Sequence, residues 1–169
     1  MIVLQSSRAM ASSKRIKEVM NEKLDLTDED AAQKDKKVAE GKVEFHHVNF
    51  RYYKEHAEWV LEDIDFTAYP GEILGIIGST GSGKSTLVQL IPRLYDVDEG
   101  QILVDGVDVR DYSLENLRQG VGMVLQKNVL FSGSIEENLR WGDEEASEEQ
   151  IQQAAQAAQA HDFVSGFTD

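Results

Sequence analysis

The feature that most constrains this chain is a glycine-rich loop, residues 78–85, which reads Gly-Ser-Thr-Gly-Ser-Gly-Lys-Ser. A short apolar run, Ile73–Ile77, precedes the loop, and its lack of alternation predicts a strand that is buried on both faces. Residues 84–94 follow with a helical pattern that ends near Pro92. Strand, loop and helix in this order predict an α/β fold with the loop at one edge of a sheet.

The loop satisfies the spacing G-x-x-x-x-G-K-[ST], which suits the binding of a polyphosphate. Glycines let the backbone turn tightly, so that successive N–H groups converge on the anion beside the positive end of the following helix. Lys84 can reach the β- and γ-phosphates, and the Ser85 hydroxyl can ligate Mg²⁺. We expect a phosphate cradle made of Ser79, Thr80, Gly81, Ser82, Gly83, Lys84, Ser85 and Thr86.

The rest of the chain shows strand, turn and helix signals. Near-alternation of apolar and polar residues, or short apolar runs, predict further strands over residues 43–50, 59–68, 101–104, 107–109 and 121–125. Residues 69–72 (Tyr-Pro-Gly-Glu) predict a turn, and Asp105-Gly106 predicts a hairpin. Two capping boxes predict helix starts, namely Ser134 with Glu137, and Ser147 with Gln150 ahead of residues 151–160.

The first 41 residues differ from the rest in charge. Residues 1–24 carry five basic and two acidic side chains, and Met10, Ile16 and Val19 recur at roughly helical spacing. This pattern predicts an amphipathic helix, with an ordinary surface helix as the alternative. Residues 25–41 are polar and acidic, and we expect a linker there.

Composition excludes several classes of protein. The chain has 169 residues, and 17 Lys plus Arg stand against 31 Asp plus Glu, for a net charge of −14. This is the opposite sign from a protein that binds the nucleic-acid backbone. There is no cysteine for a disulfide scaffold, no signal-peptide pattern, and no apolar run near the roughly 18 residues of a membrane span. We expect a domain that faces the cytosol and has no nucleic-acid partner.

Two familiar kinds of nucleotide-binding protein do not fit. The strings D-x-x-G and N-K-x-D, which a GTPase would show, are both absent from the sequence. A dinucleotide-binding fingerprint needs a third glycine where this chain has Thr86.

Several motifs in register closely resemble the nucleotide-binding domain of ATP-binding cassette (ABC) transporters, and within that family the exporters. They are Asn49-Phe50-Arg51-Tyr52, residues 60–66, Pro70-Gly71-Glu72, the loop at 78–85, residues 98–106, Val124-Leu125-Gln126 and residues 130–135. The resemblance runs from about Lys42 to Asp169. Residues 1–24 look like the cytoplasmic end of the last transmembrane helix of exporters that fuse both domains in one chain.

The resemblance implies roles for further residues. Tyr52 matches the aromatic residue that stacks on adenine, and Tyr53 is its neighbour and alternative. Gln126 matches the glutamine that contacts Mg²⁺ and the attacking water and links the site to the membrane domain. The residues implied as catalytic are therefore Lys84 and Gln126, and Ser85 and Gln126 are the implied metal ligands. Residues 130–138 match the region near the transporter's coupling helices.

The resemblance also implies that parts of the domain are missing. The family's signature L-S-G-G-Q, its Asp-Glu pair after an apolar strand and its switch histidine have no counterpart in the chain. We therefore expect the first half of the ATPase domain, residues 42–169. The expected fold is a three-layer α/β P-loop core, truncated before the signature and the second acidic motif. An antiparallel β subdomain would come from residues 42–70 and 101–109, and a helical subdomain would begin at Ser134.

The function that the resemblance implies is ATP binding, with Mg²⁺, that energises export across a membrane at its cytoplasmic face. Its implied partners are a transmembrane domain and a second nucleotide-binding domain, in a homodimer or a heterodimer. Two alternatives are a degenerate subunit that binds nucleotide and regulates its partner, and an ABC ATPase outside transport. Because a strong group to polarise the attacking water is missing, we expect the 169 residues alone to be inactive in hydrolysis.

Overall fold

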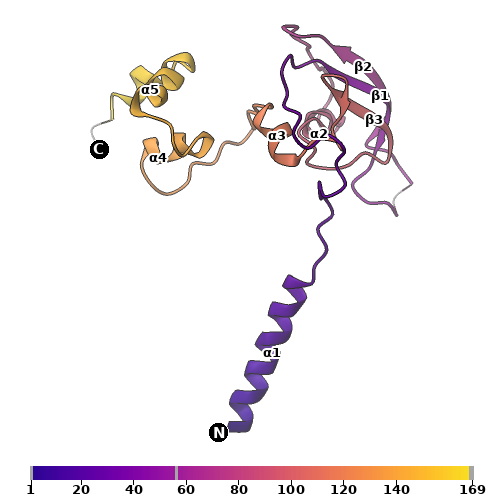
Figure 1. Cartoon of the computed structure of the whole chain (residues 1–169), viewed down its shortest axis with the longest axis vertical. Coiled ribbons are helices and arrows are strands. Elements are labelled where there is room, and N and C mark those ends of the chain that lie inside the picture. Colours follow the sequence, from indigo (N-terminus) through magenta and orange to yellow (C-terminus); the bar gives the residue numbers. More distant parts are fainter. Residues whose placement is uncertain (1, 56, 168–169) are drawn as a thin grey trace. The chain divides into compact units, whose positions relative to one another are not determined.

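The computed structural model describes residues 2–55 and 57–167, and the chain divides into two compact units, Met1–Gly122 and Met123–Asp169. A four-stranded antiparallel sheet with the strand order β2-β1-β3-β4 forms the centre of the first unit. Figure 1 labels β2, β1 and β3 in this order. Its strands are β1 (Val43–Phe50), β2 (Leu61–Ala68), β3 (Glu99–Val104) and β4 (Val107–Asp108). Val43 of β1 lies opposite Ala68 on one side and Val104 on the other.

Strand β1 contains an irregularity that keeps its large apolar side chains in the core. Phe45, Val48 and Phe50 are all buried, although strict alternation would place Phe45 and Val48 on opposite faces. The pairing register shifts between Phe45 and Val48, and His47 in this stretch has a φ of 48°. A bulge of this kind moves the following residues to the other face of the strand. The strand predicted over residues 43–50 is confirmed, together with this local break.

Two short helices pack their apolar side chains into the same core. Helix α2 (Lys84–Leu90) contributes Leu87 and Leu90, and α3 (Leu114–Gln119) contributes Leu117. Helix α2 ends earlier than the predicted Leu94, because Pro92 has no N–H to donate and Arg93 adopts a left-handed φ of 50°.

Both predicted turns are present. In the β3–β4 hairpin, Asp105 and Gly106 have φ values of 50° and 75°, the left-handed pair that a tight two-residue turn requires. The turn at residues 69–72 is closed by the Glu72 N–H, which donates to the Tyr69 carbonyl oxygen at 3.0 Å.

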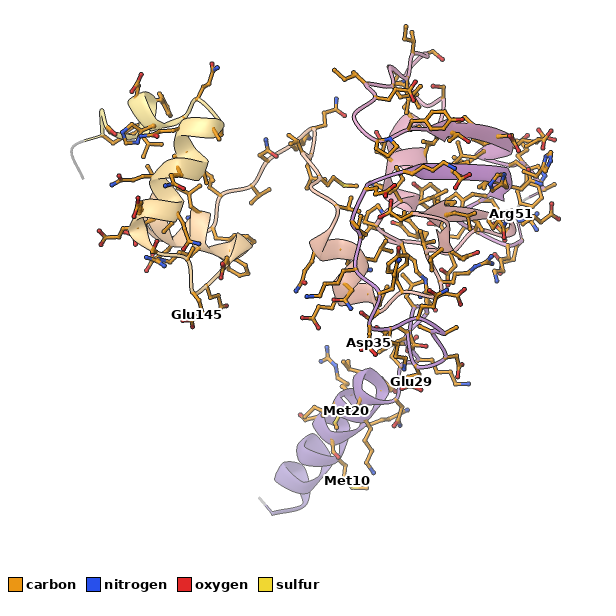
Figure 2. The ribbon with its side chains drawn as sticks, turned by 45° about the horizontal axis from the view of Figure 1, so that its top comes forward. Met10, Met20, Glu29, Asp35, Arg51 and Glu145 are labelled. Carbon is orange, nitrogen blue, oxygen red and sulfur yellow. The ribbon has the colours of Figure 1, made fainter. Side chains whose placement is uncertain are left out.

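The acidic segment at residues 25–41 lies against the hairpin and α3. The Asp105 carboxylate accepts N–H bonds from four successive residues, Ala39 to Lys42, at 2.7 to 3.0 Å. Asp28 accepts from the Leu114 N–H at 2.9 Å, and Val38 packs against the core. Figure 2 labels Glu29 and Asp35 on this segment. The segment is thus held to the first unit by specific contacts.

Two predicted strands do not form. Residues 73–77 and 121–125 have no strand pairing in the structure, and Ile73, Ile77 and Val124 are 97%, 98% and 90% exposed. The apolar pattern of residues 73–77 predicts a strand buried between neighbours, but among the described residues only β1 to β4 form a sheet. Without adjacent strands to supply hydrogen bonds, both segments run as irregular extended chain.

Helix α1 (Ile2–Met20) confirms the helix predicted near the amino terminus, although it ends before Leu24. Its described apolar side chains are exposed, among them Ile16, Val19 and Met20; Met10 and Met20 are labelled in Figure 2. Within residues 2–55 and 57–167, the structure has no helix with the length and apolar character needed to cross a membrane.

The second unit is helical, with α4 (Ile135–Leu139), the short 3₁₀ helix η1 (Arg140–Gly142), α5 (Glu148–Ala157) and α6 (His161–Val164). Both predicted capping boxes are present. Ser134 Oγ accepts from the Glu137 N–H at 3.1 Å, and Glu137 returns the interaction to the Ser134 N–H at 2.7 Å. Ser147 and Gln150 make the same reciprocal pair at the start of α5. The helix starts were predictable because these caps depend on local sequence alone.

Candidate functional site

The glycine-rich loop connects the extended residues 73–77 to α2, and its last glycine explains how the turn is made. Gly83 is the N-cap of α2 with a left-handed φ of 83°. A Cβ atom at this position would lie 2.8 Å from Leu61 Cδ2 and 2.9 Å from the Val60 carbonyl oxygen. Both the backbone conformation and the close approach of β2 therefore require glycine here. The loop is consequently held against Val60 and Leu61, where β2 begins.

Lys84 lies at the centre of the loop. Its ammonium group donates to the carbonyl oxygens of Gly78 and Ser79, at 2.9 and 2.6 Å, and to Ser82 Oγ at 3.3 Å. The loop backbone thus curls around the positive charge. A phosphate oxygen that entered this loop would find the lysine nitrogen within reach, since the lysine remains partly exposed.

A cavity of about 290 Å³ lies over the loop. It is lined by Tyr52, Val60 and the six consecutive residues Gly81, Ser82, Gly83, Lys84, Ser85 and Thr86. Seven of these eight were predicted as site residues. Ser79 and Thr80 belong to the same loop and are exposed, but they do not line the cavity. Val60 was missed, because nothing in the sequence indicates that the residue before β2 reaches the loop.

Tyr52 joins the cavity from the segment between β1 and β2. A hydrogen bond of 2.9 Å links its Oη to Oγ1 of Thr86, which is itself buried in the first turn of α2. The predicted base-stacking residue and the predicted phosphate loop are therefore in direct contact, although 34 residues separate Tyr52 from Thr86. Tyr53 does not line this cavity and is 63% exposed.

Oxygen ligands for a metal are limited at the site. Among the residues that the structure describes, no group of three His, Cys, Asp or Glu side chains could hold a metal ion. The exposed Ser85 hydroxyl lines the cavity next to Lys84. Mg²⁺ keeps several waters and is commonly held by one or two protein oxygens together with substrate phosphates. A single hydroxyl beside a phosphate cradle fits that kind of site.

Gln126, the other predicted metal ligand, belongs to the second unit. It follows residues 121–125, in an irregular stretch, and its side chain is exposed. Its role stays a prediction.

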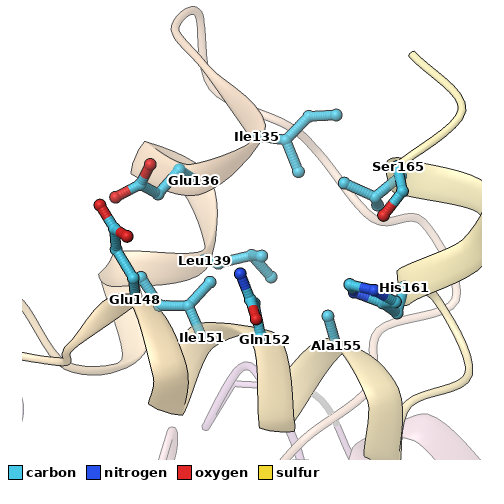
Figure 3. Close-up of a pocket in the computed structure, with 10 residues that line it drawn as sticks. Ile135, Glu136, Leu139, Glu148, Ile151, Gln152, Ala155, His161 and Ser165 are labelled. Carbon is cyan, nitrogen blue, oxygen red and sulfur yellow. The ribbon is translucent and has the colours of Figure 1, made fainter.

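The second unit has its own pocket, of about 370 Å³, between α4, α5 and α6 (Figure 3). Ile135, Leu139, Ile151 and Ala155 give it an apolar lining, and Glu136 and Glu148 lie near one another at one end. The Glu136 carboxylate forms a salt bridge with Arg140, whose Nη2 donates to Oε1 at 2.8 Å. No residue that the sequence assigns to nucleotide or metal lines this pocket.

A lysine-centred glycine loop that leads into a helix, with a hydroxyl after the lysine and an aromatic ring beside it, defines a nucleotide-binding domain of the P-loop class. The comparisons specify the family. The model of the ABC transporter family matches residues 61–168, and the chain belongs to this family. The fold class predicted from the sequence is confirmed.

Known relatives agree with this assignment. The chain is 44% identical over 163 residues to YgaD of Bacillus subtilis (strain 168), which is named as a multidrug export ATP-binding/permease protein. It is 40% identical over 157 residues to the ATP-dependent lipid A-core flippase of Syntrophus aciditrophicus (strain SB). These matches cover 96% and 93% of the chain, which spans 28% and 26% of the two relatives.

A solved structure shows the same fold. The chain matches a bacterial Atm1-family ABC exporter with ATP bound, at a TM-score of 0.85 and 29% sequence identity. The match covers 96% of this chain and 28% of that one.

Proposed function

We propose that this chain binds Mg-ATP at the loop of residues 78–85, and that in the whole protein ATP binding and hydrolysis energise export across a membrane. The observation that carries the proposal is the single cavity that Tyr52 and residues 81–86 share. It offers a cation and backbone N–H groups for phosphates at one end and an aromatic ring for a base at the other.

Each predicted residue has a specific task in this proposal. Lys84 exchanges its bonds to the loop carbonyls for bonds to the β- and γ-phosphates, while the N–H groups of residues 79–83 converge on the same oxygens. Ser85 supplies its hydroxyl to Mg²⁺, Thr86 adds a hydroxyl or amide near the phosphates, and Tyr52 stacks on the base. Mg²⁺, when bound, neutralises charge that develops on the phosphates. Gln126 contacts Mg²⁺ and the attacking water and couples the nucleotide site to the membrane domain.

The domain organisation follows the same proposal. Residues 42–169 form the N-terminal half of the nucleotide-binding domain, and residues 1–24, which contain α1, are the segment through which a transmembrane domain joins it. Residues 25–41 join the two and are held by Asp105. The partners are that transmembrane domain and a second nucleotide-binding domain, at the cytoplasmic face of the cell membrane. The names of the relatives and the ATP bound in the similar solved exporter structure support this organisation, and the charge of −14 argues against nucleic acid.

The central test is Lys84→Ala in the whole protein that carries this sequence. Loss of a charged donor to the transferring phosphate should lower ATP turnover by about 10²- to 10³-fold, as for other single electrostatic donors in active sites. Steady-state phosphate release measures the effect. Lys37→Ala, which removes an exposed lysine from the acidic segment, is the matched control and should retain normal turnover. Full turnover in the Lys84→Ala protein would contradict the assignment.

A further inference from the structure

Three aromatic rings, two from the end of β1 and one from the turn after α2, meet beside the candidate ATP cavity. Phe50 ends β1, Tyr52 follows it by two residues, and Tyr95 comes from the turn after α2. The Tyr52 ring packs edge-on against both others, with centroid distances of 5.0 Å to Phe50 and 5.1 Å to Tyr95 and interplanar angles of 83° and 85°. Phe50 and Tyr95 are also in contact, at 5.7 Å. Edge-to-face pairs of this kind favour one relative orientation of the rings.

The bond to Thr86 holds only the hydroxyl end of Tyr52, and the segment that carries the ring has little regular structure, so the neighbouring rings add support to its face. Residues 51–55 and 57–60 form no helix or strand, and Tyr52 is 44% exposed. Its ring borders two cavities, the one over the phosphate loop and a second of about 580 Å³. The second cavity is lined by Phe50 and Tyr95, among others, and by Leu24 and Leu26 from the chain after α1. A ring that is free to turn into this second space would no longer present its face above the loop.

Tyr95 is itself rigidly placed. The turn that carries it is held by Arg93, which is buried and pairs with Asp96 through Nε and Oδ1 at 2.6 Å and through Nη2 and Oδ2 at 3.1 Å. Arg118 of α3 donates from Nη2 to the Arg93 carbonyl oxygen at 2.9 Å. The Leu94 N–H also donates to the Gln89 carbonyl oxygen of α2 at 3.1 Å, so the backbone just before Tyr95 is bonded to both α2 and α3. A fixed ring at this place can hold a less fixed neighbour.

We propose that Tyr95 is a positioning residue for base recognition: its ring packs edge-on against the Tyr52 ring at the border of the second cavity and holds it in the orientation that stacks on the nucleotide base. The inference rests on the proposed ATP site. Tyr95 is absent from the lining of the cavity over the loop, so it acts through Tyr52 and not on the nucleotide itself. Because Tyr95 restricts the Tyr52 ring before a base binds, less side-chain entropy is lost on binding. The entropy cost avoided is about that of immobilising one side chain.

The test compares ATP with its bare phosphate chain, inorganic tripolyphosphate, which lacks both the ribose and the base. Binding of Mg-ATP and of inorganic tripolyphosphate with Mg²⁺ is measured by calorimetry on the whole protein and on Tyr95→Ala, Tyr95→Phe, Tyr52→Ala and the double alanine variant. We expect Tyr95→Ala to weaken ATP binding about 3- to 10-fold, from the usual cost of ordering one side chain, and to leave tripolyphosphate binding unchanged. Tyr95→Phe, which keeps the ring, should restore ATP affinity.

The double variant separates positioning from a general structural effect. In the Tyr52→Ala background, Tyr95→Ala should cause no further loss of ATP affinity, because there is no ring left to hold. Tyr69→Ala removes an exposed tyrosine from the turn after β2 and serves as the matched control. If Tyr95→Ala does not fold, Tyr95→Leu replaces the ring with an apolar side chain and should show the same selective weakening.

Three results would overturn the proposal. One is unchanged ATP affinity in folded Tyr95→Ala or Tyr95→Leu, and another is an equal loss of tripolyphosphate affinity in these variants. The third is a loss of ATP affinity on Tyr95→Ala that is as large in the Tyr52→Ala background as in the wild type. Failure of the wild-type protein to bind either ligand would instead contradict the proposed function.

Discussion

Asp105 is the residue whose removal should most clearly loosen the segment between α1 and the sheet. Its Oδ2 accepts the N–H groups of Ala39 and Glu40, and its Oδ1 accepts those of Gly41 and Lys42. Asp105→Asn is the informative change, because asparagine tolerates the left-handed conformation that the hairpin requires. An amide retains one oxygen, so two of the four N–H groups lose their acceptor and face an NH₂ group instead.

The expected magnitude follows from this count. A net hydrogen bond is worth about 1 kcal/mol, so two lost bonds should cost about 2 kcal/mol of local stability. That corresponds to a ~30-fold larger equilibrium constant for local opening. The assay is hydrogen exchange of the Ala39–Lys42 amides at neutral pH, which reports local opening directly. Asp35→Asn, an exposed carboxylate on the same segment, is the control and should leave these amides protected.

The pH dependence of the same amides provides an independent check. Burial by itself raises the pKa of Asp105, but the N–H donors of Ala39, Glu40, Lys42 and Gly41 outweigh it and hold the pKa below the ordinary 3.8. A lowered folded-state pKa means that the contribution to stability is present above 3.8 and is lost as the pH falls through the folded value. Protection should therefore decline on acidification in the wild type and not in Asp105→Asn. Equal protection of the two proteins at neutral pH would refute the reasoning.

Three other predictions concern the site and the sheet. If Tyr52 only stacks, Tyr52→Phe should bind ATP nearly normally and Tyr52→Ala should lose about 1 to 3 kcal/mol of binding free energy; unchanged binding in Tyr52→Ala with failure in Tyr53→Ala would show that the neighbour takes the role. The Asp63 hydrogen bond at 2.7 Å, with the charges of Asp63 and Asp65, raises the pKa of His47 above 6.5. The contribution of protonated His47 to folding stability is therefore full below pH 6.5 and is lost as the pH rises through the raised pKa. An NMR titration of His47 should give a midpoint above 6.5, and this midpoint should fall in Asp63→Asn. The 169 residues by themselves should release phosphate at background, unaffected by Lys84→Ala; turnover above about 0.1 per second, set against typical values of 1 to 10³ per second, would show that a catalytic carboxylate is already present.

The parts of the fold that could be predicted from the sequence depend on neighbours along the chain. The β3–β4 turn follows from Asp105-Gly106, and the starts of α4 and α5 follow from capping boxes four residues long. The phosphate loop belongs to the same group, since glycine spacing and the lysine are sufficient to place residues 81–86 around one cavity. Sequence rules for caps and turns succeed here because the residues that interact lie within a few positions of one another in the chain.

The parts that sequence reasoning missed depend on residues far apart. Asp105 reads as a turn residue, and nothing in the pattern indicates that its carboxylate binds four N–H groups about 65 residues earlier. The acidic character of residues 25–41 likewise predicts only a linker, because hydrogen bonds to the backbone of this segment are independent of its side chains. Val60 and Tyr95 were missed for the same reason, since their neighbours are set by how the sheet and α2 pack.

The unpaired apolar segment at residues 73–77 shows how the two kinds of information combine. Its composition is that of a strand buried on both faces, yet Ile73 and Ile77 are almost fully exposed. The loop that follows nevertheless keeps its form, because Gly83 lies against Leu61, the first residue of β2, and against Val60 just before it, and Lys84 is bonded to the loop's own carbonyls. The phosphate loop is therefore anchored on the helix side, through the antiparallel sheet, and does not depend on pairing of the segment before it. A proline at Ile77 should consequently leave phosphate binding intact, as measured with tripolyphosphate, whereas Gly83→Ala should abolish it; loss of binding in Ile77→Pro would show that strand pairing on the N-terminal side shapes the loop after all.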